Sequence, residues 1–331
     1  MRGFCVRTIV GVLAAVLVTA ACSSPLPAAS TGRSGEPSID RSAPPLAAAS
    51  SITDPHGRKI SLPKPPERIV CLSGLCDDMV VELGMTPVGT SSPALISHPA
   101  LLGQGGSAVP VVQGSFGSED VESIARLRPD LVVGLSGVHE PLATAIEKFA
   151  PLWLTEPKNW QESVGYLRGL GALTGRVEQA VRAEREFRGK LADAVARTRQ
   201  TGQARRTVVL MYGSVDSIGV DTADSLKGDL LKQLFSYPFP AKGSDVSTAS
   251  NYSVEELLAR KPDVVFVYSL LFSDKDRTLS AQLADNPVWR QVPAVTGNRV
   301  HEMHAKLWGS GRGTRSLSAV IDQALEKVPS A

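Results

Sequence analysis

Two stretches of this 331-residue chain repeat one pattern, in which a short helix and a basic residue lead to a Pro-Asp pair and a buried strand. The first stretch occupies 121–133 and the second 254–266, and Glu122 and Glu255 stand at the same offset before the two prolines. Because proline disfavours the helical conformation in the residue before it, each helix ends here and a strand can begin. The repeat predicts two similarly built lobes, each with one glutamate near the start of a helix.

Apolar segments recur through both halves of the chain and alternate with helical patterns. We expect strands at 68–72, 87–90, 131–134, 152–154, 207–211, 264–268 and 300–303. Continuous apolar strands between amphipathic helices indicate parallel sheets that are covered on both faces. The longest helical pattern, at 160–199, lies between the two alternating halves.

The sequence therefore predicts an α/β fold of two lobes with parallel β-sheets flanked by helices, joined by one long interlobe α-helix. The expected boundaries are 52–158 for the N-terminal lobe, 159–202 for the helical region and 203–331 for the C-terminal lobe.

Residues 1–21 have the pattern of an export signal, because Arg2 and Arg7 precede an apolar run that is too short to span a bilayer comfortably. The run ends in Thr19-Ala20-Ala21-Cys22, which resembles a bacterial lipobox, whose cysteine is lipidated and becomes the mature N-terminus. The alternative is ordinary secretion with an unmodified cysteine. Residues 22–51 are rich in Ser, Pro, Ala and Gly and are predicted to form a lipidated, flexible tether. We expect an exported protein that is lipid-anchored to the outer face of the bacterial cell membrane.

Two cysteines remain in the folded part, Cys71 and Cys76, across a predicted strand-to-helix turn. An exported protein meets an oxidising environment, so a disulfide between them is possible. Two small buried hydrophobic side chains would explain the same residues, and the sequence leaves both interpretations open.

Charge and motifs argue against several functions. A net charge of +2 gives no electrostatic case for nucleic acid. The chain contains neither the Gly-x-Ser-x-Gly elbow of hydrolases nor a Gly-x4-Gly-Lys phosphate loop. His301 and His304 surround a strand end, where residues three apart face opposite sides, so a shared metal is not expected. We expect no enzyme and no metal site, and the alternative from another class is a lipid-anchored, two-lobed enzyme.

The candidate ligand site lies in the loops beyond the carboxyl ends of the strands, where parallel α/β lobes bind ligands. His139 and Tyr212 lie in or near two of these loops. Phe116 lies in a Gly- and Ser-rich loop before the first repeat helix, and Trp308 follows the last strand. Aromatic faces suit a flat or bulky ligand, although Trp308 could equally belong to the core.

Three cations near these loops, Arg277, Lys306 and Arg312, could neutralise an anionic ligand. The alternative for each arginine is a solvated surface position.

Short motifs spread over the chain carry a family likeness. They occupy 66–70, 82–89, both Pro-Asp repeats, 170–175, 286–289 and 298–300. In this order they resemble the class of periplasmic binding proteins with a rigid interlobe helix, which deliver siderophores, cobalamin or heme to ABC importers. The resemblance implies that Phe116 and Trp308 contact the ligand. It also implies that Glu122 and Glu255 pair with arginines of a permease dimer.

Within that resemblance, an iron–siderophore complex is the favoured ligand, and heme and cobalamin are the alternatives. The cationic candidates favour the siderophore, whereas axial heme ligation would depend on His304, Met303 or Tyr212. We expect a monomer that has no cofactor, carries a small-molecule iron chelate and meets the membrane only through its lipid anchor and its permease.

Overall fold

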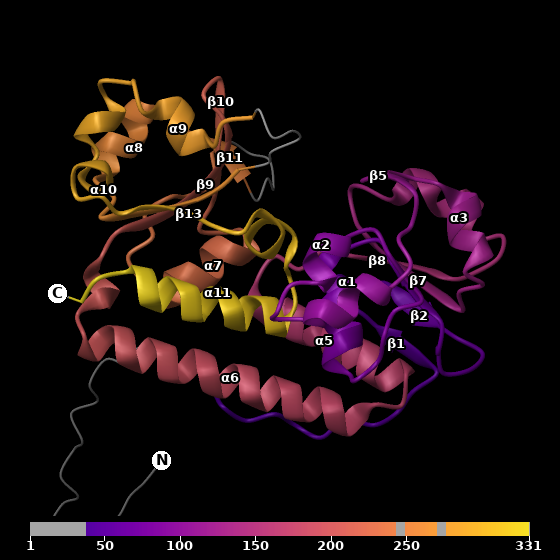
Figure 1. Ribbon diagram of the computed structural model, residues 1–331. Coiled ribbons are helices and arrows are strands. Elements are labelled where there is room, and N and C mark those ends of the chain that lie inside the picture. The colour runs from indigo at the N-terminus through magenta and orange to yellow at the C-terminus, as the bar shows by residue number, and fades with distance from the viewer. Residues whose placement is uncertain (1–37, 243–248, 270–275, 331) are drawn as a thin grey trace, which may run out of the picture. The chain divides into compact units, whose positions relative to one another are not determined.

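The computed structural model describes residues 38–242, 249–269 and 276–330 (Figure 1). The predicted export signal and Cys22 lie outside these ranges. Among the residues that are described, no helix is long and apolar enough to cross a bilayer.

The N-terminal lobe is built on a four-stranded parallel sheet with the order β4-β3-β7-β8. Its strands are β3 (Ile69–Cys71), β4 (Gly89–Thr90), β7 (Leu131–Leu135) and β8 (Leu152–Thr155). Its helices are α1 (Gly74–Glu82), α2 (Pro93–Ile96), η1 (Gly103–Ala108), α3 (Val121–Arg126), η2 (Glu140–Leu142) and α4 (Ala143–Ile146). Two hairpins complete it, namely β1 (Ser51–Thr53) with β2 (Lys59–Ser61) and β5 (Gly114–Ser115) with β6 (Ser118–Glu119). Apolar clusters cover both faces of the sheet, as the continuous apolar strands predict.

The C-terminal lobe has a five-stranded sheet with the order β11-β10-β9-β12-β13. Its strands are β9 (Val208–Ser214), β10 (Ser217–Asp221), β11 (Ala249–Asn251), β12 (Val264–Tyr268) and β13 (Val300–Glu302). Its helices are η3 (Gln203–Arg205), α7 (Leu226–Leu234), α8 (Val254–Arg260), α9 (Leu279–Leu283), η4 (Trp289–Gln291), α10 (Pro293–Thr296), η5 (Lys306–Ser310) and α11 (Thr314–Lys327). Strands β9, β12 and β13 are parallel, whereas β10 pairs antiparallel with β9 and β11. The sheet is therefore mixed, because a hairpin follows β9 where the sequence predicts only parallel strands.

The helical region between the lobes consists of α5 (Trp160–Leu173) and α6 (Val177–Gln200), and α6 runs beneath both lobes in Figure 1. Gly175, at φ +71°, makes the turn between the two helices. Buried Glu184 of α6 receives Arg168 of α5 at 2.5 Å and Arg188 at 2.8 Å. This paired charge fixes α5 against α6, and removing either arginine would leave a poorly compensated buried carboxylate.

The sequence repeat is also a structural repeat. Arg128 and Lys261, the residues before the two Pro-Asp pairs, both adopt φ +48°. The Asp130 carboxylate accepts the backbone N–H of Arg68 at 2.9 Å, and the Asp263 carboxylate accepts that of Thr207 at 2.8 Å. Each aspartate therefore ties its turn to the start of the neighbouring strand, which explains why the same pair occurs in both lobes.

Residues 39–50, here named the strap, lie along α5 and α6 (the indigo segment below α6 in Figure 1). Arg168 donates to the carbonyls of Pro44 and Pro45 at 3.0 and 3.1 Å, and Ala49 donates to Ala172 O at 3.0 Å. The prediction of a flexible tether over 22–51 is therefore wrong for residues 39–50. Arginine donors and backbone pairing hold a segment whose own composition contains little that could form a core.

A seam joins the lobes where α1 meets the start of α11. The Asp78 carboxylate of α1 accepts the backbone N–H groups of Arg315 at 3.1 Å and Ser316 at 2.8 Å. Gly313, the N-cap of α11, supplies no side chain for this purpose, and a Cβ there would lie 2.3 Å from the Asp78 carboxylate. A buried carboxylate from one lobe thus caps a helix of the other lobe.

Candidate functional site

A cleft of about 460 Å³ lies between the lobes. The N-terminal lobe lines it with Ser73, Gly74, Ser91, Ser92, Phe116 and Leu135. The C-terminal lobe lines it with Tyr212, Tyr268, Lys306, Gly309, Ser310 and Arg312. Most of these residues end or follow strands of the two sheets, so the cleft is where the strand pattern places it.

The turn between β3 and α1 forms part of the cleft wall and is closed by a disulfide. Cys71 and Cys76 are bonded, with their Cα atoms 5.2 Å apart, and both are fully buried. Of the two interpretations that the sequence leaves open, the structure has the disulfide. The bond spans Ser73 and Gly74, so it fixes the backbone of two residues that line the cleft.

Phe116 sits on the tip of the β5–β6 hairpin with 65% of its surface exposed. Its ring meets His139 edge-on at 5.5 Å between centroids. The hairpin therefore presents an apolar face to the cleft, as predicted.

His139 does not line the cleft, which corrects the sequence prediction. It is fully buried, its Nδ1 accepts the backbone N–H of Leu135 at 2.8 Å, and its Nε2 lies 3.2 Å from Glu119 Oε1. Since Nδ1 is an acceptor, Nε2 carries the proton and donates to Glu119. The buried His139 ring packs against Phe116, and its hydrogen bonds to Glu119 and Leu135 join the β5–β6 hairpin to β7.

Tyr212 and Tyr268 form an aromatic wall on the opposite lobe. Their rings stack with centroids 5.0 Å apart and planes 14° from parallel. Gly219 of β10 makes room for this pair, because a Cβ there would lie 2.6 Å from the Tyr212 ring. The predicted Tyr212 is therefore in the cleft. Tyr268 is the last residue of its predicted strand, so the strand-end rule could have found it too.

Arg312 lines the cleft on a short segment between η5 and α11. Ser163 of α5 donates to the Arg312 carbonyl at 2.8 Å, and Lys227 donates to the carbonyl of Gly311. Among the described residues, the Arg312 guanidinium forms no ion pair. The backbone is held from two helices while the cation remains available to a ligand, and Lys306 adds a second exposed cation to the same cleft.

A smaller chamber of about 140 Å³ adjoins the cleft and shares Tyr212, Tyr268 and Arg312 with it. Lys227 and Asp221 also line this chamber. Burial, together with the charge of Arg312, lowers the pKa of Lys227 to about 7, while burial raises the pKa of Asp221. The Lys227 amine is thus only partly protonated at neutral pH, and Arg312 supplies most of the positive charge next to the small chamber. The pair joins the last residue of β10 to the first turn of α7, and it was not predicted from the sequence.

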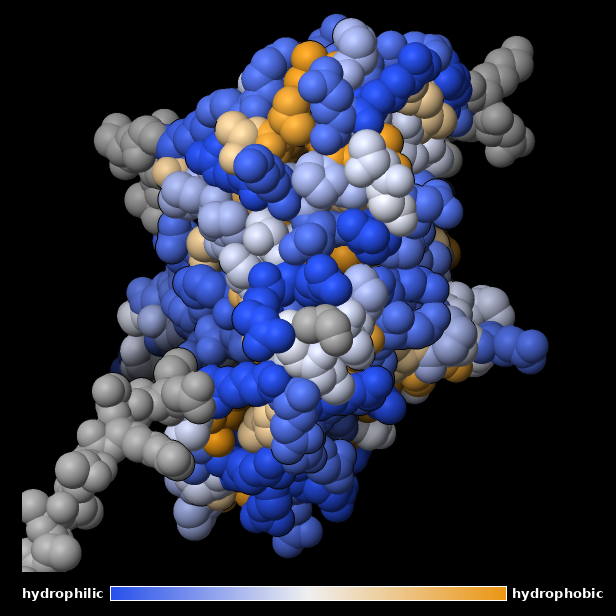
Figure 2. All heavy atoms as spheres, turned by 90° about the vertical axis from the view of Figure 1, so that its left-hand side faces the viewer, coloured by the Kyte–Doolittle hydropathy of each residue, from blue (hydrophilic) through white to orange (hydrophobic). Residues whose placement is uncertain are grey.

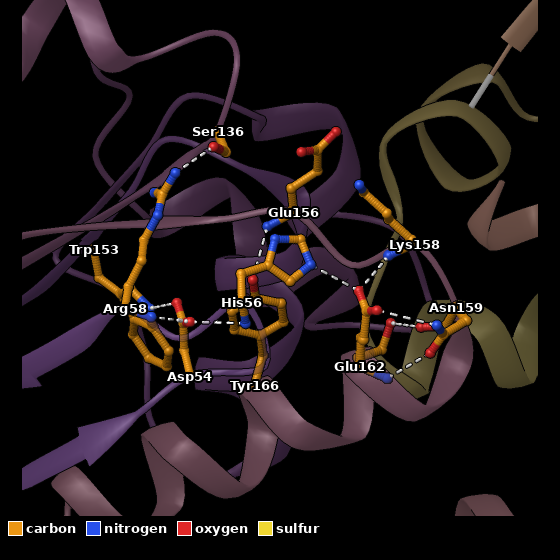
Figure 3. A network of polar contacts seen from close by, with 11 residues as sticks. Asp54, His56, Arg58, Ser136, Trp153, Glu156, Lys158, Asn159, Glu162 and Tyr166 are labelled. Atoms are coloured by element: carbon orange, nitrogen blue, oxygen red, sulfur yellow. Dashed lines mark hydrogen bonds and ion pairs between the residues drawn. The ribbon is translucent and has the colours of Figure 1, made fainter. Parts of the chain in front are cut away.

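Figure 3 shows the polar network around residues 156–159, the segment that connects β8 to α5. His56 Nε2 lies 3.0 Å from Glu162 Oε2, which also accepts the backbone N–H of Lys158 at 2.8 Å. Asp54 accepts the backbone N–H groups of His56 and Arg58, both at 2.9 Å. The turn of the β1–β2 hairpin therefore holds the segment 156–159 in place through Glu162. Glu156 and Pro157 of this segment line the small chamber.

Two other predicted ligand contacts lie outside the cleft. Trp308 is fully buried, packs on Phe266 at 4.9 Å between ring centroids and donates from Nε1 to Gln323 at 2.7 Å. It belongs to the core of the C-terminal lobe, which corrects the prediction of ligand contact. Arg277 is exposed, donates to the carbonyl of Ala281 and is not among the residues that line the cleft.

The predicted docking glutamates are exposed, and each is the second residue of its helix, Glu122 in α3 and Glu255 in α8. Both helices lie on the side of the molecule away from α6 (Figure 1). Figure 2 shows that the described surface at the α8 end is mostly hydrophilic, with hydrophobic residues in small separate patches. A contact made by this surface would therefore be mainly polar.

His98, which follows α2, and His304, which precedes η5, bring the two lobes into contact, with their ring centroids 4.9 Å apart. Of the three candidate axial heme ligands, His304 and Met303 are not among the residues that line the cleft, whereas Tyr212 is. Within the described ranges, no group of three or more His, Cys, Asp or Glu side chains could hold a metal ion.

Comparison with known proteins places this architecture. The putative ABC transporter substrate-binding lipoprotein YhfQ of Bacillus subtilis is 26% identical over 82% of this chain and 87% of its own length. The Fe(3+)-citrate-binding protein YfmC of the same organism is 26% identical over 84% of this chain and 85% of its own. The structure of Staphylococcus aureus SirA complexed with staphyloferrin B superposes with a TM-score of 0.65 at 20% identity, over 84% of this chain and 98% of that one.

A model of the family described as periplasmic binding protein matches residues 69–307, which include most of both lobes and the helices between them. Of the described residues that line the cleft, only Gly309, Ser310 and Arg312 lie outside the match. The chain therefore belongs to the periplasmic binding protein family.

Proposed function

We propose that this protein captures a ferric siderophore between its lobes and delivers it to the permease of an ABC importer. The observation that carries the proposal is the cleft itself. Aromatic side chains from both lobes and an Arg312 with no ion pair among the described residues face one space of about 460 Å³. Such a site suits a bulky complex with anionic oxygen atoms. The names of the relatives, one of which binds Fe(3+)-citrate, support the same ligand class.

The described cleft offers hydroxyls, aromatic rings and cations, but no nucleophile paired with a base. His139 is engaged by Leu135 and Glu119 behind the wall, so it is not available as a base for the serines that line the cleft. These features support binding and release rather than catalysis. Heme is less well supported, because His304 and Met303 lie outside the residues that line the cleft. Tyr212 does line it, but burial raises the pKa of its phenol, which disfavours the phenolate that would bind heme iron.

The location and partners belong to the same proposal. Cys22 would carry the lipid, the protein would act as a monomer on the outer face of the membrane, and Glu122 and Glu255 would meet a permease dimer. The support is the repeat, which places one exposed carboxylate at matching positions of two similar lobes. The relative YhfQ, named a lipoprotein, supports the anchor.

The test is a titration of the mature chain with ferric siderophores of the carboxylate, hydroxamate and catecholate classes, and with heme and cobalamin. Quenching of tyrosine and tryptophan fluorescence gives the affinity, with an iron-free chelator as control. At least one ferric siderophore should bind more tightly than heme or cobalamin. Saturable binding of heme or cobalamin with no response to any ferric siderophore would overturn the proposed ligand class.

A further inference from the structure

The start of α1 is uncapped and lines the cleft. Ser73 occupies the N-cap position, yet its side chain makes no capping hydrogen bond. The first amides of a helix have no acceptors within the helix, and a serine at this position usually supplies one. The nine-residue helix α1 therefore has amide donors at its first turn and a partial positive charge near Ser73 and Gly74.

Two serine hydroxyls beside these amides have no hydrogen-bond partner among the residues that the structure describes. Ser73 is only 2% exposed, and its Oγ atom is buried without a hydrogen bond within the structure. The Oγ atom of Ser91, which follows β4, is in the same condition. Both residues line the cleft. A buried hydroxyl without a partner costs stability, so its presence in the wall of a binding cleft points to a ligand atom that completes the bond.

The surroundings hold these donors in place. The Cys71–Cys76 disulfide closes the turn that carries Ser73. On the other side, a Cβ on Gly74 would lie 2.3 Å from the carbonyl oxygen of Ser310. The backbone of the C-terminal lobe therefore packs directly on the start of α1, and Arg312 follows Ser310 by two residues. Donors from both lobes line one part of the cleft, and their positions are set before a ligand arrives.

The acidic residues of α1 leave this arrangement intact. Asp77 lies in the first turn, but burial raises its pKa well above the usual range, and one of its oxygens accepts the Thr90 hydroxyl at 3.0 Å. Burial favours the neutral form of this carboxyl, which does not repel an anion. Asp78 is directed to the backbone of α11, where two N–H groups bind it.

We propose that the start of α1, together with Ser73 and Ser91, forms an oxyanion subsite that binds a carboxylate of the ferric chelate beside Arg312. The ligand then belongs to the carboxylate class, and this inference rests on the proposed function. A carboxylate accepts several hydrogen bonds on two oxygens, which matches amide, hydroxyl and guanidinium donors on one wall. A ferric tris-hydroxamate carries no net charge, so it would gain less from a helix start and a guanidinium.

The experiment compares the wild-type chain with Ser73→Ala, Ser91→Ala and the double variant. The probes are ferric citrate, a ferric hydroxamate, a ferric catecholate and iron-free citrate. Ser107→Ala is the matched control, because this exposed serine of the same lobe bonds only to the carbonyl of Gln104. Ser73→Gly is a second variant at the N-cap, where glycine is well tolerated.

Ferric citrate should bind the wild type most tightly of the probes, and iron-free citrate only weakly. The double variant should lose about tenfold to a hundredfold in affinity for ferric citrate, as expected for hydrogen bonds to a charged group. Its affinity for the other ferric probes should not change. Its unfolding midpoint should stay the same or rise, because the substitutions remove buried hydroxyls that have no partner in the free protein.

Two results would overturn the subsite. One is an equal loss for all ferric probes, and the other is unchanged affinity for ferric citrate. Tightest binding of the hydroxamate or catecholate would refute the carboxylate class while leaving the proposed function in place. If no ferric probe binds the wild type, the proposed function fails as well.

Discussion

Arg312 is available to a ligand because its surroundings bind its backbone, while its guanidinium has no ion pair in the part of the chain that the structure describes. Ser163 holds its carbonyl, and Lys227 holds that of the preceding glycine. Lys227 itself is a poor competitor for an anion, since its pKa of about 7 leaves it partly neutral. At this scale, the cleft presents to a ligand a guanidinium on a segment that two helices hold in place.

Replacing Arg312 by alanine should weaken binding of a ferric carboxylate chelate by about tenfold or more, because a charged hydrogen-bond donor is lost. Arg312→Lys should recover part of the affinity, since it keeps the charge but loses the planar fork. Arg277→Ala is the matched control outside the cleft and should bind like the wild type. Titration by fluorescence quenching measures all three, and equal affinities for Arg312→Ala and Arg277→Ala would exclude Arg312 from the site.

Glu82 gives a pH dependence to stability. Burial, with the nearby charge of Asp78, raises its pKa from 4.5 to about 7. Between these values the folded chain holds a proton that the unfolded chain has released, so the free energy of unfolding falls as pH rises through this window. The group should cost up to about 3 kcal/mol by pH 8, at about 1.4 kcal/mol per pKa unit.

Glu82→Gln should remove most of this loss, because the amide stays neutral at every pH and can still accept the Thr314 hydroxyl. Urea unfolding of wild type and variant at pH 5 and pH 8 measures the difference. Glu178→Gln, at an exposed position of α6, is the control. A wild type and a Glu82→Gln variant with parallel pH profiles would contradict the assignment.

The residues that sequence reasoning placed correctly are those that the backbone alone positions. Phe116 on a hairpin tip and Tyr212 near a strand end are in the cleft because chain direction puts them there. His139 and Trp308 failed because side-chain direction and packing decided their places, with Glu119 and Gln323 as partners from elsewhere in the chain. A pattern that locates a loop does not say which of its side chains turns inward.

Among the elements, α1 connects the cleft with both lobes. Its first turn lines the cleft, its disulfide ties it to β3, and Asp78 caps α11 of the other lobe. Separating the lobes at the seam would leave the Asp78 carboxylate and the first amides of α11 without partners, and both losses are costly. The seam therefore opposes wide opening, in addition to the resistance of the continuous helix α6 to bending.

Ligand binding should accordingly close the lobes only slightly. Small-angle scattering profiles of the free and the ligand-saturated protein should nearly superimpose. In Asp78→Ala the seam loses its cap, so the unfolding midpoint should fall and the free protein should become less compact. A large compaction of the wild type on binding would contradict the rigid seam.

The elements that could be predicted are those with a strong local pattern. The two Pro-Asp repeats, the buried strands β7 and β12 and the long helix α6 all follow from apolar spacing and from the residues that end a helix. The β9–β10 hairpin was missed, because β10 is short and contains no continuous run of apolar residues. The strap was missed because its order comes from Arg168, which lies more than a hundred residues away.

In the whole molecule, helices α3 and α8, which carry Glu122 and Glu255 in their first turns, lie on the side away from α6 (Figure 1). Because both glutamates lie outside the cleft lining, the double variant Glu122→Arg/Glu255→Arg should bind ligand as the wild type does. Uptake of the radiolabelled iron chelate in cells should collapse, since charges at a docking surface set orientation and association rate. A double variant that changes Glu67 and Glu147 to Arg is the control for net charge. Normal uptake, or lost ligand affinity in the folded double variant, would contradict the docking role.

The strap determines how many residues can connect the folded receptor to the membrane. It holds the chain against α6 from residue 39 onward, so the proposed lipid on Cys22 would leave only the residues from 23 to 38 to span the distance to the membrane. At about 3.5 Å per residue they reach at most about 55 Å. The strap runs along α6, on the side away from α3 and α8 (Figure 1). If Glu122 and Glu255 face the permease as proposed, the segment 23–38 joins the receptor on the side away from the permease. The length of this segment would then limit how far the receptor can move from its lipid anchor and still dock.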